Sequence, residues 1–366
     1  MNKHHPENER AKRRYFVFIK EAKRQNEASV DAVAKAISRF EEYTKWRDFK
    51  AFHFEQAVGF KAHLAKSRNE KTGDALSKAT MNSTLCAIKS FFQWLAMQPS
   101  YKSRLNFTET EYFNLSQKEA RVATARRDRP APTLEQIRHT IALMPQASAI
   151  DRRNRALFAF ALLTGARDSA LASFKLKHLD LEAGFVFQDA REVKTKASKT
   201  FTSYFFPVGD DILSIVQDWA NFLQVELLFG LDDPLFPKTE VKPNGSRVFA
   251  PVGLSREHWS NASPIRGIFK DAFKRAGLAY FNPHSFRKTL VRLAQTMCLD
   301  AEEFKAWSQN LGHAGVLTTF YSYGEVQPCR QSEIFKSLQS PRNKVNGQNV
   351  DELAAAVVRA MREQPA

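Results

Sequence analysis

Apolar residues recur at intervals of three and four positions along the first hundred residues of the chain. The segments that show this spacing most clearly are residues 14–25, 29–46 and 80–98. In the last segment the apolar stripe consists of Leu85, Ile88, Phe92 and Leu95. This spacing is the period of an amphipathic α-helix, so we expect residues 1–105 to form a small all-helical domain.

The pattern changes over residues 106–132, where polar and basic residues replace the helical period and Pro130 and Pro132 close the segment. Such a stretch predicts a linker between two domains. Its four clustered arginines are Arg121, Arg126, Arg127 and Arg129. An arginine-rich connector is suited to phosphate contact, but a solvated linker has the same composition, and the sequence favours neither interpretation.

A second domain is predicted over residues 133–340, where Thr133 and Glu135 resemble the start of a helix. The apolar run over residues 156–165 predicts a buried helix that ends near Gly165. The further helices that we expect are residues 212–223, 265–278, 284–297 and 301–311. Gly277 is positioned to close the second of these.

Strands are predicted within residues 185–208, because β-branched and aromatic residues lie on both sides of a basic turn at 194–199. The fold class that follows is mainly α with a small β-sheet. The tail, residues 341–366, holds an apolar stripe within 349–362 that predicts a short amphipathic helix. That helix has two equally supported interpretations, docking on a partner or packing on its own domain.

Charge directs the interpretation toward polyanions. The 366-residue chain has 55 Lys+Arg against 39 Asp+Glu, a net charge of +16. Residues 1–130 hold 26 basic and 15 acidic residues, and the rest of the chain holds 29 and 24. A folded and strongly basic protein commonly binds nucleic acid, although basic charge also serves solubility alone. The 30 Phe and 43% hydrophobic residues allow sizeable cores and exclude a disordered basic tail.

Cysteine usage and apolar run lengths exclude several protein classes. Cys86, Cys298 and Cys329 are far apart, which excludes a disulfide framework and a CxxC zinc site and fits a reducing cytosol. Residues 1–14 are charged and lack the apolar region of a secretory signal. No apolar run approaches the roughly 18 residues of a membrane span. P-loop and HExxH patterns are also absent.

Four short motifs in the second domain carry candidate chemistry. They are Thr-Gly-Ala-Arg ending at Arg167, Val-Lys-Thr-Lys containing Lys194, His-Ser-Phe-Arg from His284 to Arg287, and Leu-Gly-His ending at His313, with Tyr321 and Tyr323 following. Each motif alone is weak, because a turn lysine is usually solvated and an arginine after a helix usually lies on the surface. Their order and combination decide the interpretation.

Together the motifs resemble the tyrosine recombinase (phage integrase) family, over about residues 133–335. The resemblance implies a helical core-binding (SAM-like) domain followed by a mixed α/β catalytic domain. It implies a site-specific DNA recombinase or integrase, which cuts and rejoins strands through a covalent 3′-phosphotyrosine without metal, ATP or another cofactor.

The residue types suit that chemistry. Two guanidiniums, of Arg167 and Arg287, can bind the non-bridging oxygens of a phosphate. His284 and His313 can donate to the same phosphate or relay protons. The leaving 5′-oxygen needs a proton, and the lysine that best fits the family's turn is Lys194. Its neighbours Lys196 and Lys199 are rivals for that role and are expected to contact DNA.

The nucleophile is expected to be Tyr323, with Tyr321 as the alternative. The family's usual spacing, nine residues after the Leu-Gly-His histidine, falls on Ser322. The segment Tyr-Gly-Glu-Val beginning at Tyr323 resembles the family's Tyr-x-x-Val ending, which implies a one-residue insertion after Thr319.

Two positions depart from the family pattern. Ala170 stands where the family usually has an acidic residue three positions after the first arginine, although Asp168 follows Arg167 directly. Lys288 stands where a histidine often follows the second arginine. Ala170 and the shifted position of the tyrosine motivate an alternative: a DNA-binding relative with a decayed site that acts in regulation or element maintenance. A type IB topoisomerase-like or resolvase activity is the other alternative.

The resemblance also implies partners. Double-stranded DNA is the substrate, and a tetramer on two DNA sites is expected to form from monomers or dimers. Accessory DNA-bending proteins are a further class of partner to test. The expected location is cytoplasmic and nucleoid-associated, in a bacterial or mobile-element setting, with no membrane partner.

Overall fold

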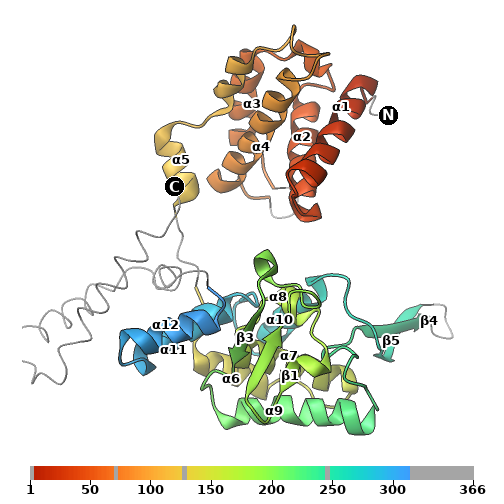
Figure 1. Ribbon diagram of the computed structural model, residues 1–366, viewed down its shortest axis with the longest axis vertical. Helices are drawn as coiled ribbons and strands as arrows, with labels where there is room; N and C mark the ends of the chain where they lie inside the picture. The colour runs from red at the N-terminus through yellow and green to blue at the C-terminus, as the bar shows by residue number, and fades with distance from the viewer. Residues whose placement is uncertain (1–3, 70–72, 126–129, 244–247, 314–366) are drawn as a thin grey trace, which may run out of the picture. The chain divides into compact units, whose positions relative to one another are not determined.

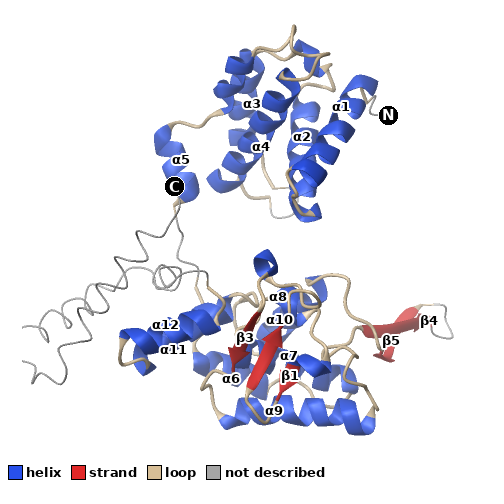
Figure 2. Cartoon of the chain, in the orientation of Figure 1, coloured by secondary structure: helices blue, strands red, loops and turns tan. Residues whose placement is uncertain are grey.

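The computed structural model describes residues 4–69, 73–125, 130–243 and 248–313. The chain divides into two compact units, Met1–Arg127 and Asp128–Ala366, each with a hydrophobic core of its own (Figure 1). Both units are mostly helical, and the described strands belong to the second unit (Figure 2). None of the described helices is long and apolar enough to cross a membrane.

The first unit is a bundle of helices, as the sequence predicts. Its main helices are α1 (Pro6–Val17), α2 (Glu27–Tyr43), α3 (Phe54–Lys66) and α4 (Lys78–Ala96), and α1 continues into a π-helical turn, η1 (Phe18–Ala22). A short 3-10 turn, η2 (Phe49–Ala51), joins α2 to α3. Asn26 and Ser77 cap α2 and α4 by accepting backbone N–H groups with their side chains.

The apolar stripe of α4 lies in the core of the first unit. Leu85 is 2% exposed, and Ile88, Phe92 and Leu95 are fully buried. Aromatic rings from other elements pack around it. The Phe52 ring stacks on Phe92 with centroids 4.2 Å apart, and the Phe40 ring meets Phe92 edge-on at 5.2 Å. Burial of these rings supplies the main driving force for the bundle.

Residues 106–124, expected to be part of a linker, fold with the first unit instead. They form η3 (Phe107–Phe113) and α5 (Gln117–Thr124), both of which contact α4. Phe113 is 1% exposed and stacks on Phe52, and Lys78 bonds Glu119 across 2.7 Å. A single aromatic anchor in a polar stretch leaves no periodic signal, which is why the sequence pattern misses it.

The second unit is built around the buried helix α7 (Ala149–Thr164), which ends at Gly165 as predicted. The preceding helix, α6 (Leu134–Ala142), begins at Thr133 with a capping box, but the partner is Gln136 and not Glu135. The other helices are α8 (Asp168–Leu171), α9 (Asp210–Asn221), α10 (Ser263–Arg275), α11 (Ser285–Met297) and α12 (Ala301–Asn310), and α9 continues into η6 (Phe222–Glu226). Gly277 follows α10 with φ 69°, as expected for a closing glycine.

The strands predicted within residues 185–208 are present, and a short strand before them, which the sequence did not predict, completes an antiparallel sheet of order β1-β2-β3. Its strands are β1 (Leu179–Asp180), β2 (Phe185–Gln188) and β3 (Phe201–Tyr204). Val186 is paired with both Leu179 and Ser203 and is fully buried against the α7 core. The long β2–β3 connection contains the basic residues and a 3-10 turn, η5 (Lys196–Ser198), so it is a loop and not a tight turn.

A second hairpin, which the sequence pattern did not predict, is formed by β4 (Thr239–Pro243) and β5 (Phe249–Leu254). It stands apart from the three-stranded sheet (Figure 2). Prolines and glycines interrupt the alternation in both strands and hide the signal. Arg153 of α7 anchors its base by donating to the Pro237 carbonyl (2.7 Å) and the Thr239 hydroxyl (3.2 Å).

Candidate active site

Arg167 follows a turn that favours glycine. Gly165 ends α7 with φ 61°, a left-handed conformation that favours glycine. An added Cβ would lie 2.8 Å from Cδ2 of Leu311 and 3.1 Å from Cδ1 of Leu290. The chain then enters α8, with Arg167 at its N-cap. Within the described part of the chain, the guanidinium of Arg167 has neither a hydrogen bond nor an ion pair.

Arg287 projects from α11 toward the same turn. It is only 4% exposed. Its guanidinium donates to the carbonyl oxygens of Gly165 (2.6 Å) and Leu311 (2.5 Å), while Nε is buried without a partner among the described residues. Burial and then the Arg167 charge lower the pKa of Arg287 to about 9, which leaves it cationic at neutral pH. A buried cation with a spare donor is poised to bind an anion.

The Leu-Gly-His motif follows the end of α12 and is fixed to β3. Asn310 accepts from the Tyr204 N–H (2.6 Å) and donates to the Tyr204 carbonyl (2.9 Å). Gly312 has φ 65°, and a Cβ there would lie 2.5 Å from Cζ of Phe201. Ser203 adds a bond to the Asn310 carbonyl (3.0 Å). These contacts set the position from which His313 leaves the helix.

The structure brings the two arginines and the two histidines together. Partial desolvation lowers the pKa of His284 to about 4, with further contributions from Arg287 and Arg167. Burial lowers the pKa of His313 to about 3, and the same arginines add to the shift. His284 remains accessible to solvent at the N-cap of α11. Both rings are therefore neutral at pH 7 and sit in a strongly positive field.

The predicted lysines lie on the exposed β2–β3 loop, in different surroundings. Lys194 is fixed by its backbone N–H, which donates to the Ser173 hydroxyl (2.9 Å), and its ammonium donates to the Ser260 carbonyl (3.4 Å). The charge of Lys196 contributes to the pKa shifts of both His284 and His313. Lys196 therefore lies close enough to the two histidines for its charge to act on them. Lys199 lies over the Phe201 ring, 5.9 Å from its centroid.

The cluster suits an oxyanion. Two guanidiniums and two imidazoles converge from three separate segments, and no described carboxylate pairs with either guanidinium. Asp168, next to Arg167 in the chain, binds Arg266 of α10 instead, with 2.7 Å between Nη2 and Oδ2. Within the described ranges, no group of three or more His, Cys, Asp or Glu could hold a metal ion.

The sequence of the second unit identifies the family. A sequence model described as the phage integrase family matches residues 132–328, which is more than half of the chain. The chain belongs to the phage integrase family. No curated protein sequence matches it significantly.

Two solved structures of similar fold are integrases bound to DNA. One is a lambda integrase dimer bound to a COC′ core site, with 13% identity and a TM-score of 0.57 over 87% of this chain and 97% of that one. Another is the Tn1549 transposon integrase in complex with transposon right end DNA, with 15% identity and a TM-score of 0.54 over 90% of this chain and 99% of that one. At these identities the likeness establishes the tyrosine recombinase fold, with its N-terminal helical domain.

Several residues that the sequence predicts for the site or for DNA contact lie outside the described ranges. They are Tyr321, Tyr323, Arg126, Arg127 and Arg129, together with the tail at 341–366. Arg121 is described and lies exposed on α5.

Sequence reasoning missed the groups that hold the site together. The carbonyls of Gly165 and Leu311 orient Arg287, and a backbone carbonyl has no signature in sequence. Ser173 links α8 to the β2–β3 loop that contains the lysines. Its hydroxyl donates toward the Ala170 carbonyl (3.1 Å) and accepts from Lys194. Thus Ala170, which lacks the family's acidic side chain, still takes part through its backbone.

Proposed function

We propose that this integrase cuts and rejoins DNA at specific sites through a covalent 3′-phosphotyrosine. The observation that carries the proposal is the convergence of Arg167, Arg287, His284 and His313 inside the region that matches the family, with no described carboxylate paired to either guanidinium. Such a cluster binds one phosphate and stabilises the charge that develops on it during displacement.

In the proposed first step, the Tyr323 Oη attacks the scissile phosphorus. The Oη–P bond forms, the P–O5′ bond breaks, and the phenol proton passes to a base. His284 and His313, both neutral before DNA binds, are the bases within the cluster. A phenol ionises near pH 10 in water, so the surrounding cations assist by favouring the phenolate.

The leaving 5′-oxygen takes its proton from a lysine of the β2–β3 loop. Lys194 fits the family's turn, while Lys196 exerts its charge on both histidines. In the second step the 5′-hydroxyl of a partner strand attacks the phosphotyrosine, and each proton returns along the reverse path. The phosphotyrosine bond conserves the energy of the broken linkage, so no nucleotide or metal cofactor is required.

The proposed assembly is a tetramer on two duplex sites, formed from free monomers or dimers, with accessory DNA-bending proteins as further candidates. The first unit and its arginine-rich end would grip the DNA backbone, and the second unit would perform the chemistry. A cytoplasmic, nucleoid-associated location fits such a substrate.

The deciding experiment is covalent trapping on a nicked suicide substrate. After cleavage, the short DNA fragment that carries the new 5′-hydroxyl diffuses away, so the strand cannot be rejoined and the protein–DNA adduct accumulates. We expect wild-type protein and Tyr321→Phe to form a protein–DNA adduct, and Tyr323→Phe to form none. An adduct that persists in Tyr323→Phe and disappears in Tyr321→Phe would move the nucleophile to Tyr321. Specific DNA binding without any adduct in the wild type would establish the decayed-site alternative, and adduct formation with relaxation of supercoils at no preferred sequence would establish a topoisomerase-like activity.

A further inference from the structure

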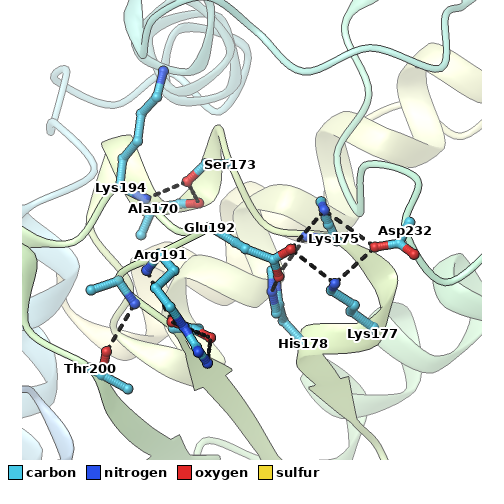
Figure 3. A network of polar contacts seen from close by, with 12 residues as sticks. Ala170, Ser173, Lys175, Lys177, His178, Arg191, Glu192, Lys194, Thr200 and Asp232 are labelled. Atoms are coloured by element: carbon cyan, nitrogen blue, oxygen red, sulfur yellow. Dashed lines mark hydrogen bonds and ion pairs between the residues drawn. The ribbon is translucent and has the colours of Figure 1, made fainter.

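A second charged cluster lies near the start of the β2–β3 loop (residues 189–200), which we call the lysine loop. The catalytic proposal does not use this cluster. Glu192 stands two residues before Lys194 and faces three donors from the segment after α8 (Figure 3). Its Oε1 is 3.0 Å from Nζ of both Lys175 and Lys177. Its Oε2 is 2.9 Å from Nε2 of His178.

The His178 ring has a fixed orientation, and this orientation determines where Glu192 lies. The ring is 4% exposed at the end of the short 3-10 turn η4 (Leu176–His178). Nδ1 is 3.0 Å from the backbone N–H of Lys175 and must accept that hydrogen. In the neutral ring Nε2 therefore carries the proton and donates it to Glu192. A buried ring that is hydrogen-bonded at both nitrogens cannot rotate, so the carboxylate of Glu192 can accept from Nε2 in one position only.

Asp232 shares the lysines and keeps them in place. Its Oδ1 is 2.8 Å from Lys177 Nζ and 3.3 Å from Lys175 Nζ. Hydrogen bonds from Lys177, Lys175 and His178 lower the pKa of Glu192 to about 2, so the carboxylate is ionised at any pH where the protein works. An isolated surface ion pair contributes little to stability, but three donors on one carboxylate restrict its position more than a single pair does.

The contacts continue along the chain to the lysine. Val193 is 2% exposed and belongs to the core around α7. Lys194 then donates its backbone N–H to Ser173. Beyond this point the loop is exposed, and Ala197 and Ser198 adopt left-handed φ values of 56° and 50°. The loop is thus fixed at Glu192, Val193 and Lys194, immediately before its exposed part.

We propose that Glu192 is a positioning residue: its contact with His178, Lys175 and Lys177 sets where the loop lysine meets the leaving 5′-oxygen. The inference rests on the proposed function and holds whether Lys194 or Lys196 is the proton donor, because both follow the fixed point. Figure 3 shows the Lys194 side chain extending away from the Glu192 cluster, so the cluster places the lysine without competing for its ammonium group.

The test uses two suicide substrates that differ in one atom. In the first the scissile bond is P–O5′, and in the second sulfur replaces the bridging 5′-oxygen. A thiolate leaves without a proton because thiols ionise near pH 8.5, so a defect in proton donation vanishes on the sulfur substrate. We expect Glu192→Gln to slow adduct formation about 10- to 100-fold on the oxygen substrate, less than the roughly 100- to 10,000-fold that full loss of general acid catalysis costs, because the lysine itself remains. On the sulfur substrate it should stay within about twofold of wild type.

Matched variants complete the design. Glu182→Gln alters an exposed glutamate of the β1–β2 turn and should leave both rates unchanged. Ser173→Ala removes the acceptor of the Lys194 N–H and should show the same sulfur rescue as Glu192→Gln. Lys194→Ala and Lys196→Ala, measured on both substrates, identify the proton donor. DNA affinity and melting temperature are measured for every variant.

The outcomes separate the two proposals. A wild-type protein that forms no adduct on either substrate would overturn the proposed function. A wild-type adduct together with a Glu192→Gln defect of equal size on both substrates would mean that Glu192 supports the fold alone, and the positioning role would be rejected. An unchanged rate on the oxygen substrate would reject it as well.

Discussion

Arg287 is held by backbone carbonyl oxygens, where a carboxylate would have been the more obvious partner. The oxygens of Gly165 and Leu311 orient the guanidinium without neutralising its charge. A carboxylate in their place would compete with the substrate phosphate for the same donors. The absence of an acid at Ala170 is consistent with this arrangement, because the backbone supplies the orientation that the family's acidic residue otherwise helps to provide.

The positive charge around the site histidines makes the stability of the DNA-free protein depend on pH. The pKa of His313 is about 3 in the folded state, against 6.5 for an unperturbed histidine. Between these values the unfolded chain binds more protons than the native protein, so the free energy of unfolding falls as the pH drops below about 6.5. We expect His313→Gln to flatten this dependence, because glutamine cannot take up the proton.

The measurement is urea unfolding of wild type and His313→Gln at pH 7.0, 5.5 and 4.5. His284→Gln is the second variant, since its pKa is lowered in the same direction to about 4. Wild type should lose more stability than either variant on going from pH 7.0 to 4.5. Parallel curves for all three proteins would show that these rings do not carry the predicted shifts.

At the level of elements, the turn after α12 is held by close packing against β3. Gly312 combines a left-handed φ of 65° with a Cβ position 2.5 Å from the Phe201 ring. We expect Gly312→Ala to lower the free energy of unfolding by about 1–3 kcal/mol through backbone strain alone. It should lower the adduct rate further by displacing His313.

Gly267→Ala is the matched control, because Gly267 lies within α10 and a Cβ there meets no atom within 4 Å. Alanine in a helix interior stabilises relative to glycine by about 0.5–1 kcal/mol. Chemical unfolding and adduct formation should therefore separate the two glycines. If both variants unfold at the same denaturant concentration, the turn is more tolerant than its geometry indicates.

The elements also show where sequence reasoning succeeds and where it stops. Helix α4 could be predicted because its burial repeats with the helical period, as the fully buried Ile88 illustrates. Helix α7 could be predicted from its continuous apolar run, because all of residues 156–164 are buried. The hairpin β4–β5 could not, because Pro243 and Pro251 interrupt any alternation. The site motifs were visible as residue types in order, but Ser173, Glu192 and the carbonyl partners of Arg287 join the site only through the tertiary fold.

For the whole molecule, the open question is where the net charge of +16 acts. The described part of the second unit uses many cations internally, as in the pairs Arg138–Asp211 and Arg256–Asp233. Residues 1–130 hold 26 basic against 15 acidic residues, and four of the basic ones, Arg121, Arg126, Arg127 and Arg129, are close together in the sequence. The sequence leaves two interpretations of these four arginines, phosphate contact or plain solvation.

Salt dependence distinguishes them. Each phosphate that a protein neutralises adds about 0.9 to the slope of log K against log salt on duplex DNA. If the cluster Arg121, Arg126, Arg127 and Arg129 binds the backbone, replacing all four by Gln should weaken DNA binding and reduce the slope by about 2–4. The control replaces four paired cations of the second unit by Gln: Arg138, Arg152, Lys238 and Arg256.

Both quadruple variants lower the net charge equally, so any difference between them reports position and not total charge. Because its four charges already face carboxylates, the control should keep a slope close to that of the wild type. Fluorescence anisotropy over a series of salt concentrations gives both slopes. Equal slopes in the arginine variant and the wild type would assign the cluster to solvation.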